Sequence, residues 1–235
     1  ETLAVKKSSN KSSNNWEGIG PWDFDINAES RSYAPGAAHL YTVEQSKSNN
    51  NVLYAGAATA GAWRSNNKGD NWFHITKDFH LSSVYALEID FQDEDIIYIS
   101  GNGGLHKSID GGTNWNSVGG SNFNSQSHSI KDIKMHPQNN QIIFIASDKG
   151  LYKSTDGGIL LIEIMSGDFQ EIEFHPSSSD TMYFIKQDAN FTEFYRSNDN
   201  GDNLTLFTNG WPAPSANDEQ KRTEIAVSSA APNKI

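Results

Sequence analysis

An eight-residue pattern that returns four times along the chain restricts its fold more than any other feature. The copy at 108–115 reads SIDGGTNW, and weaker copies begin at Ser65, Ser154 and Ser197. Successive copies start 43, 46 and 43 residues apart. Self-similarity at such a period indicates a repeat architecture. One period holds about four short strands with their turns, which is the size of one propeller blade.

Strand-like patterns surround each copy. Short runs that alternate apolar and polar residues precede the second, third and fourth copies: VYALEIDF from 84, IKDIKMHP from 130 and FQEIEFHP from 169. A second apolar run leads into each copy, as in DEDIIYISGNGGLHKS. We therefore expect every unit to read strand, turn, strand, turn, strand, Asp-Gly turn, strand, and we expect no amphipathic helix.

The residue types of the repeated pattern suit a tight hairpin. Asp accepts hydrogen bonds from N–H groups just downstream, Ser adds a side-chain bond, and Gly adopts a positive φ without a Cβ clash. The Trp or Leu that follows is expected to point inward and bury apolar surface against the neighbouring unit. Since an enzyme does not need its acid in every repeat, we predict a structural role for these residues: Ser65, Asn67, Gly69, Trp72, Ser108, Asp110, Gly112, Trp115, Ser154, Asp156, Gly158, Ser197, Asp199 and Gly201.

The pattern Ser-x-Asp-x-Gly-x-x-Trp resembles the Asp-box, or BNR repeat, of sialidases, xyloglucan-active glycoside hydrolases, sortilin-type receptor domains and secreted bacterial propellers. Residues 108–115 match at every defined position, whereas Asn67 replaces Asp, and Leu161 and Leu204 replace Trp. The stretches WEGIGPW and VLYAGAATAGAWRS resemble the first blade of sortilin-like (VPS10) propellers. The resemblance spans roughly residues 16–235 and implies an all-β propeller of four-stranded antiparallel blades.

The repeat also predicts the domain organisation. Residues 1–15, rich in Ser, Asn and Lys, are expected to be a flexible N-terminal segment before a propeller over 16–235. The expected blades lie near 37–76, 84–120, 130–168 and 170–210, with the start of a fifth at 223–235. We therefore expect an incomplete ring, which the rest of the propeller beyond Ile235 would complete. A four-bladed ring closed by WEGIGPW is the alternative.

Composition limits the remaining classes of function. The chain has no Cys, so it forms neither disulfides nor thiolate metal sites. Its formal charge of −11 disfavours nucleic acid as a partner, and no apolar run is long enough to insert in a membrane. The histidines show no metal-binding spacing, and we expect no metal or other cofactor. The resemblance implies a secreted or cell-surface protein, although the polar start of this chain lacks the apolar core of a signal peptide.

The sequence lacks the catalytic residues that the resemblance to these enzymes implies. A sialidase-like site needs three converging arginines, and this chain has only Arg31, Arg64, Arg196 and Arg222. Two of them directly precede a turn serine, where Lys107 and Lys153 stand in the other units, so we interpret them as part of the repeat. The xyloglucan-active relatives carry a catalytic Asp in a stretch similar to LYAGAATAGAWR. Its counterpart here falls at or near Ala58, so this acid is missing.

These observations predict a non-enzymatic binding or scaffold module that recognises a protein or glycan ligand. Trp22, Tyr33 and Trp211 belong to irregular loops and are candidate ligand contacts, with packing at the rim of the ring as the alternative. The enzymatic alternative is a fragment of a sialidase-like or xyloglucanase-like glycoside hydrolase, whose catalytic carboxylates would lie outside this chain.

Overall fold

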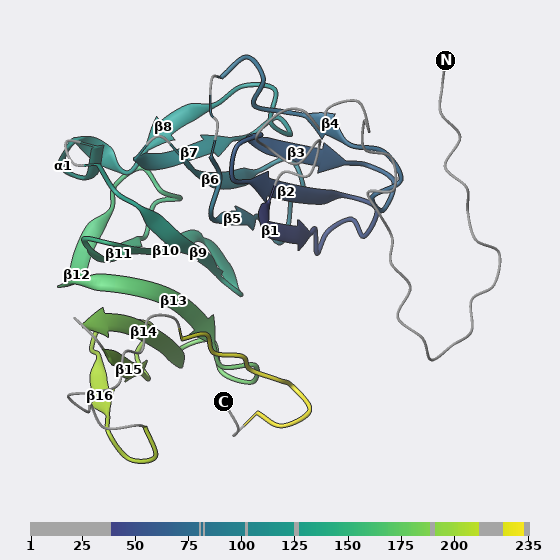
Figure 1. The fold of residues 1–235 in the computed structure, drawn as a ribbon. Coiled ribbons are helices and arrows are strands. Elements are labelled where there is room, and N and C mark those ends of the chain that lie inside the picture. The colour runs from purple at the N-terminus through teal and green to yellow at the C-terminus, as the bar shows by residue number, and fades with distance from the viewer. Residues whose placement is uncertain are drawn as a thin grey trace, which may run out of the picture. The chain divides into compact units, whose positions relative to one another are not determined.

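The protein is described by a computed structural model (Figure 1). The chain divides into two units, Glu1–Ala37 and Ala38–Ile235. The structure describes residues 39–79, 81, 83–101, 103–124, 127–188, 191–211 and 223–232. The segment expected to be flexible and the candidate contacts Trp22 and Tyr33 lie outside the described residues, so these predictions stay predictions.

Four antiparallel sheets of four strands each make up the described residues. The first sheet contains β1 (Leu40–Gln45), β2 (Leu53–Ala57), β3 (Ala62–Ser65) and β4 (Phe73–His74). The second contains β5 (Leu87–Ile89), β6 (Ile97–Gly101), β7 (Gly104–Ser108) and β8 (Asn116–Val118). The third contains β9 (Ile130–His136), β10 (Asn139–Ser147), β11 (Gly150–Ser154) and β12 (Ile162–Ser166). The fourth contains β13 (Asp168–Phe174), β14 (Met182–Asp188), β15 (Phe191–Ser197) and β16 (Thr205–Phe207).

The strand order within each sheet follows the chain order, which confirms the predicted propeller blades. Between the second and third sheets lies α1 (Gly120–Asn124), a five-residue helix that the sequence did not predict. The innermost strands are neighbours across the sheets, because β1 contacts β5, β5 contacts β9 and β9 contacts β13. Figure 1 shows the first and fourth sheets at opposite ends of this series, so the described blades form an incomplete ring.

The hydrophobic core lies between successive sheets because each inner sheet buries both of its faces. In the second sheet, Leu87 and Ile99 are paired and pack toward the first sheet. Tyr98, one residue earlier on β6, points the other way and packs toward the third sheet. Burial on both faces explains why the second strand of each unit reads as a nearly continuous apolar run.

In the second, third and fourth sheets, the large residue that ends the repeated turn packs on the preceding sheet. Trp115 joins the core between the first two sheets, and its indole N–H donates to the Ile75 carbonyl at 3.1 Å. Leu161 and Leu204 occupy the same place at the next two interfaces. Trp72 differs from the expectation of an inward residue, since it is 37% exposed. No sheet precedes it among the described residues.

The segment at 223–232 covers part of the outer face of the fourth sheet. Ile225 is buried there with Tyr183, Ile185 and Phe194. Its N–H donates to Glu171 Oε2 at 2.7 Å. The segment forms no strand among the described residues, but Ile225 takes the position that Ile172 takes on the third sheet. It therefore packs as the first strand of a blade would.

The two tryptophans form a matched test of this packing. Trp115→Ala should lower the free energy of unfolding by about 3 kcal/mol, because it opens a cavity between two sheets and leaves the Ile75 carbonyl without its donor. Trp72→Ala should cost about 1 kcal/mol or less, as expected for an exposed ring. Urea unfolding followed by circular dichroism measures both. Equal losses of unfolding free energy in the two variants would show that the Trp72 ring is buried by other residues, as the Trp115 ring is.

Candidate functional site

The same hydrogen bonds hold the repeated turn in all four sheets. In the second sheet, the buried Ser108 hydroxyl donates to Asp110 Oδ1 at 2.8 Å and accepts the Gly112 N–H at 2.9 Å. Asp110 Oδ1 also accepts the Asn114 N–H at 2.8 Å. Equivalent bonds of 2.7–3.0 Å recur in the turns that contain Ser65, Asn67 and Gly69; Ser154, Asp156 and Gly158; and Ser197, Asp199 and Gly201.

These bonds keep the turn carboxylates ionised. The Asn114 N–H lowers the pKa of Asp110, and the Leu160 N–H lowers the pKa of Asp156. The side-chain amide of Asn203 lowers the pKa of Asp199 to about 2. A carboxylate that is ionised at neutral pH and faces its own backbone is suited to hold a turn and poorly suited to transfer a proton.

The turn glycine also serves the contact between sheets. Gly112 has a φ of 91°, a backbone conformation that favours glycine. A Cβ at this position would stand 2.7 Å from Ile75 Cδ1 of the first sheet. At Gly201, which has a φ of 79°, a Cβ would stand 2.6 Å from Phe144 of the third sheet. The glycines therefore permit both the turn and the close approach of its neighbour.

A basic side chain from each sheet reaches the turn of the next. Lys107 Nζ donates to the Gly157 carbonyl at 3.1 Å, and Lys153 Nζ donates to the Asn200 carbonyl at 2.8 Å. Arg64 makes the corresponding but longer contact with Gly111, at 3.4 Å. Each cation lies over an aromatic ring of its own sheet, 5.0–5.6 Å from the centroid. This geometry supports the interpretation of the residue before each turn serine as part of the repeat.

Arg196 occupies the same position in the fourth sheet, where no turn of a following sheet is described. Its Nε is buried and has no hydrogen-bond partner among the described residues. A buried donor without an acceptor is costly. The fourth sheet thus has the basic side chain of this contact, but no carbonyl acceptor for it is described.

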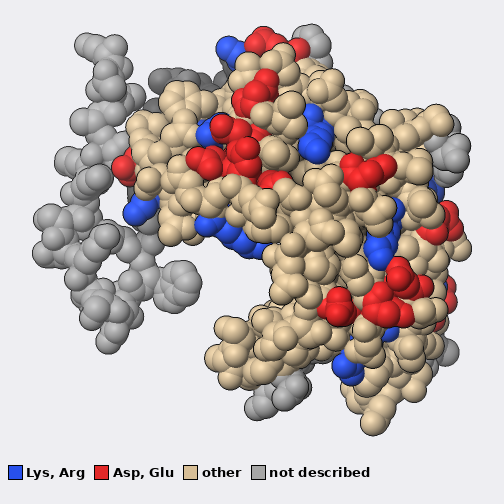
Figure 2. Space-filling model, turned by 180° about the vertical axis from the view of Figure 1, so that it is seen from behind, with Lys and Arg blue, Asp and Glu red and all other residues tan. Residues whose placement is uncertain are grey.

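Charged side chains also line up on the innermost strands. Glu44, Glu88, Lys134 and Glu173 hold equivalent positions on β1, β5, β9 and β13, each opposite an aromatic residue of the next strand. Asp132 and Glu171 stand two residues earlier on β9 and β13. We call these six residues the inner-strand cluster. Elsewhere, Figure 2 shows acidic and basic side chains interspersed on one face of the molecule.

Several members of the inner-strand cluster hold the sheets together. Asp132 Oδ2 accepts the Ile172 N–H of the fourth sheet at 3.0 Å, and Lys134 Nζ pairs with Glu173 Oε1 at 3.1 Å. Glu171 accepts the Ile225 N–H in the same way as Asp132 accepts that of Ile172. A carboxylate of β9 thus accepts a backbone amide of the fourth sheet, and a carboxylate of β13 accepts one from the segment at 223–232.

Burial changes the protonation of this cluster. It raises the pKa of Asp132 to about 6 and the pKa of Glu171 to about 7. The pKa of Glu88 rises well above its ordinary value, through burial and through the nearby charge of Glu44. Burial lowers the pKa of Lys134, but the neighbouring carboxylates Asp132 and Glu173 outweigh this effect and raise it. The cluster therefore combines one permanent cation with two carboxyl groups, Asp132 and Glu171, that titrate near neutral pH.

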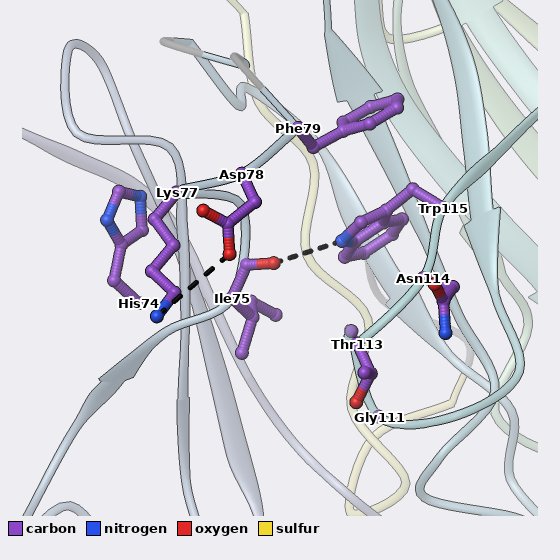
Figure 3. Close-up of a pocket in the computed structure, with 10 residues that line it drawn as sticks. His74, Ile75, Lys77, Asp78, Phe79, Gly111, Thr113, Asn114 and Trp115 are labelled. Atoms are coloured by element: carbon purple, nitrogen blue, oxygen red, sulfur yellow. Dashed lines mark hydrogen bonds and ion pairs between the residues drawn. The ribbon is translucent and has the colours of Figure 1, made fainter.

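A cavity of ≈ 560 Å³ lies between the first two sheets, where the loop after β4 faces the turn of the second sheet (Figure 3). The rings of Phe79 and Trp115 stack there with centroids 6.2 Å apart. Its ion pair, Lys77 with Asp78 at 4.0 Å, is largely exposed and contributes little stability. The lining residues are His74, Ile75, Lys77, Asp78, Phe79, Gly111, Gly112, Thr113, Asn114 and Trp115.

Aromatic side chains offer a further surface. Tyr41 and Tyr85 are about half exposed, and their ring centroids lie 4.6 Å apart. Trp211 is half-buried instead: its indole N–H donates to the Thr192 carbonyl at 2.8 Å, and its ring stacks on Phe194. The role of Trp211 as a ligand contact stays a prediction. Within the described ranges, no three His, Asp or Glu side chains are arranged to hold a metal ion. No helix there is long and apolar enough to cross a membrane.

Sequence reasoning missed the inner-strand cluster. Its signal was present, because the runs VYALEIDF, IKDIKMHP and FQEIEFHP all carry a charge at the same place: Glu88, Lys134 and Glu173. In isolation, each charge fits the solvent-facing side of an alternating strand. In the structure, the innermost strand of the neighbouring sheet partly buries the side of the strand that carries this charge.

Comparison with known proteins shows the fold alone. No family model matches the sequence, and no curated protein does. An ancestral GH74 enzyme superposes with a TM-score of 0.60 at 19% identity, over 71% of this chain and 24% of its own. The GH74 xyloglucanase from Xanthomonas campestris gives a TM-score of 0.59 at 16% identity, over 71% and 29%. YCF48 bound to a D1 peptide gives 0.51 at 15% identity, over 67% and 51%. The chain thus spans about a quarter of the GH74 proteins and half of YCF48.

The turn hydrogen bonds can be tested at Asp110. Asp110→Ala removes the acceptor for Ser108 and Asn114 and should lower the Tm by roughly 2–4 °C. Asp110→Asn should retain most of the stability, because Asn67 makes the same bonds in the first sheet. Differential scanning calorimetry compares the two variants with the parent. An unchanged Tm in the alanine variant would contradict the structural role of this side chain.

The raised pKa of Glu171 predicts a pH-dependent effect of one substitution. Its folded pKa of about 7 lies above the unfolded value of about 4.3, so the stability that Glu171 contributes is present at low pH and is lost as the pH rises through 7. Glu171→Gln should therefore gain stability relative to the parent between pH 5 and pH 8. Urea unfolding at each pH measures the difference.

The difference in unfolding free energy between the parent and Glu171→Gln cancels the contribution of titrating groups elsewhere in the chain. These include His106, His128 and His136, whose pKa values are lowered by burial and whose effect on stability has the opposite sign. A constant difference between parent and variant across this pH range would mean that Glu171 does not titrate there.

Proposed function

We propose that this chain is a non-enzymatic binding and scaffold module of the propeller class, acting at the cell surface or after secretion. One observation carries the proposal: five carboxylates at its repeated positions are engaged in holding the fold. Asp110, Asp156 and Asp199 accept backbone amides of their own turns. Asp132 accepts an amide of the fourth sheet, and Glu171 accepts an amide of the segment at 223–232. Acids occupied in this way give a rigid support for ligand-binding surfaces.

A protein or a glycan is the proposed ligand. The exposed pair Tyr41 and Tyr85 and the cavity beside Trp115 provide aromatic surface of the kind that both classes of ligand use. Among the structural neighbours, YCF48 has been seen with a bound D1 peptide. This neighbour supports a polypeptide ligand as one member of the proposed class.

We also propose that further blades cover the two terminal faces. The first sheet exposes Val43 and Trp72, whose counterparts Leu87 and Trp115 pack on the preceding sheet. The fourth sheet leaves Arg196 Nε without an acceptor among the described residues. The unfolding of the Trp72→Ala variant described above also tests this proposal. A loss as large as that of Trp115→Ala would mean that this chain already covers the face.

A fragment of a glycoside hydrolase is the second candidate. A general acid needs a raised pKa, and Asp132 and Glu171 have that property on half-buried strands. Their hydrogen bonds to backbone amides favour the scaffold instead. The loss of the family's acid at Ala58, which the resemblance implies, points the same way.

An assay for turnover and binding separates the proposed function from a hydrolase that uses Asp132 or Glu171 of this chain. The chain is incubated with xyloglucan and with sialyllactose, and the products are measured by mass spectrometry; the same protein is applied to glycan and peptide arrays. We expect saturable binding on an array and unchanged substrates in solution. Turnover that disappears in Asp132→Asn or Glu171→Gln, with normal folding of the variant, would replace the proposed function with the enzymatic one.

A further inference from the structure

Two acids of the inner-strand cluster have no counter-charge that contacts them. Lys134 is held by Glu173 at 3.1 Å, while Asp132 accepts backbone amides. Within the described part of the chain, Glu44 and Glu88 have neither a hydrogen bond nor an ion pair. The two lie on β1 and β5, which contact each other. They are therefore neighbouring carboxylates that lie within electrostatic range of Lys134 and Lys47 but that neither lysine contacts directly.

Glu88 is the more unusual of the two. Its exposed fraction is 6%, whereas acidic side chains are rarely buried unless they are paired. A buried polar group without a partner destabilises the fold, since water no longer solvates it fully and nothing replaces the water. Glu44 is half-buried, so the pair remains open to solvent on the side of β1. The structure thus places a largely buried acid, whose carboxylate oxygens are not among the fully buried atoms without a partner, beside a half-buried one.

The surroundings select the class of ligand. The charged groups that face Glu88 are Glu44 and Lys47 of the first sheet and Asp132 and Lys134 of the third. No three acidic or histidine ligands in the described ranges are placed to hold a metal, and two carboxylates alone fall short of the six to eight oxygens that calcium takes. A guanidinium or ammonium group needs only two acceptors and brings its own donors.

We propose that Glu44 and Glu88 form a binding site for a basic side chain of a partner polypeptide, inserted along the innermost strands between the first and second blades. This inference rests on the proposed binding function and narrows its ligand to a protein segment that carries Arg or Lys. The incoming cation supplies the hydrogen-bond donors that Glu88 lacks. Glu44, the accessible member, contacts it first.

The test uses two capped pentapeptides, Gly-Gly-Arg-Gly-Gly and the same peptide with citrulline, which keeps the shape of arginine without its charge. Chemical-shift titration of the 15N-labelled chain at low salt gives both affinities. The arginine peptide should bind about tenfold or more tightly than the citrulline peptide. Its affinity should rise with pH as the two acids ionise, since burial raises the pKa of both, and should fall with added salt.

Substitutions locate the site. Glu88→Gln should weaken the arginine peptide about tenfold or more, and Glu44→Gln serves as a second variant in case the first fails to fold. Asp70→Asn is the matched control, because it removes the same charge from an exposed side chain that lies outside the cluster and outside the cavity beside Trp115. The control should change the affinity less than about twofold.

Equal affinity for the arginine and citrulline peptides would overturn the inference, and so would equal affinity of the arginine peptide for the parent and for both glutamine variants. The inference would also fail if calcium chloride, and not the arginine peptide, caused chemical-shift changes that the glutamine variants lose. Failure here is distinguishable from failure of the proposed function. If the arginine peptide does not bind, binding of other ligands on the arrays still supports the proposed function. If the chain turns over a glycan substrate, the proposed function is wrong regardless of whether the arginine peptide binds.

Discussion

The buried serine at the start of each turn is the constraint on which the remaining structure depends. Ser108 and its equivalents are almost fully inaccessible, so their hydroxyls must be hydrogen-bonded within the protein. Each hydroxyl accepts the N–H of the turn glycine and donates to the residue at the Asp position. These two hydrogen bonds fix the conformation of the turn. The turn then places a large apolar side chain and a backbone carbonyl against the preceding sheet.

The sheets are then joined twice, at the outer and at the inner edge. At the outer edge, a basic side chain such as Lys107 or Lys153 reaches the carbonyl of the next turn across an aromatic ring. At the inner edge, a carboxylate such as Asp132 accepts a backbone amide of the next blade. The contact of the basic side chain repeats at all three interfaces between the described sheets, whereas the carboxylate contact joins the third and fourth sheets. Contacts between neighbouring units stabilise repeat architectures in general.

Most of the fold followed from local patterns. The period of the turns, the alternation in IKDIKMHP and the Asp-Gly chemistry of SIDGGTNW are all properties of nearby residues, so the four antiparallel blades could be predicted. The five-residue α1 could not, because GSNFN has too little length for a periodic signal. The exposure of Trp72 was also missed, since it depends on whether another sheet covers the ring rather than on the turn that carries it.

The amino-acid sequence by itself determined the blade as a unit: four strands, a repeated turn and one large residue directed at a neighbour. It did so because each of these features depends on backbone preferences and side-chain bonds within a few residues. Only the tertiary structure decided which charges meet on the innermost strands. Asp132 and Ile172, or Glu44 and Glu88, lie about one repeat apart in the chain, and stacking of the blades brings each pair together. Burial between the strands then decides which of these acids are held by a partner and which are left to bind one.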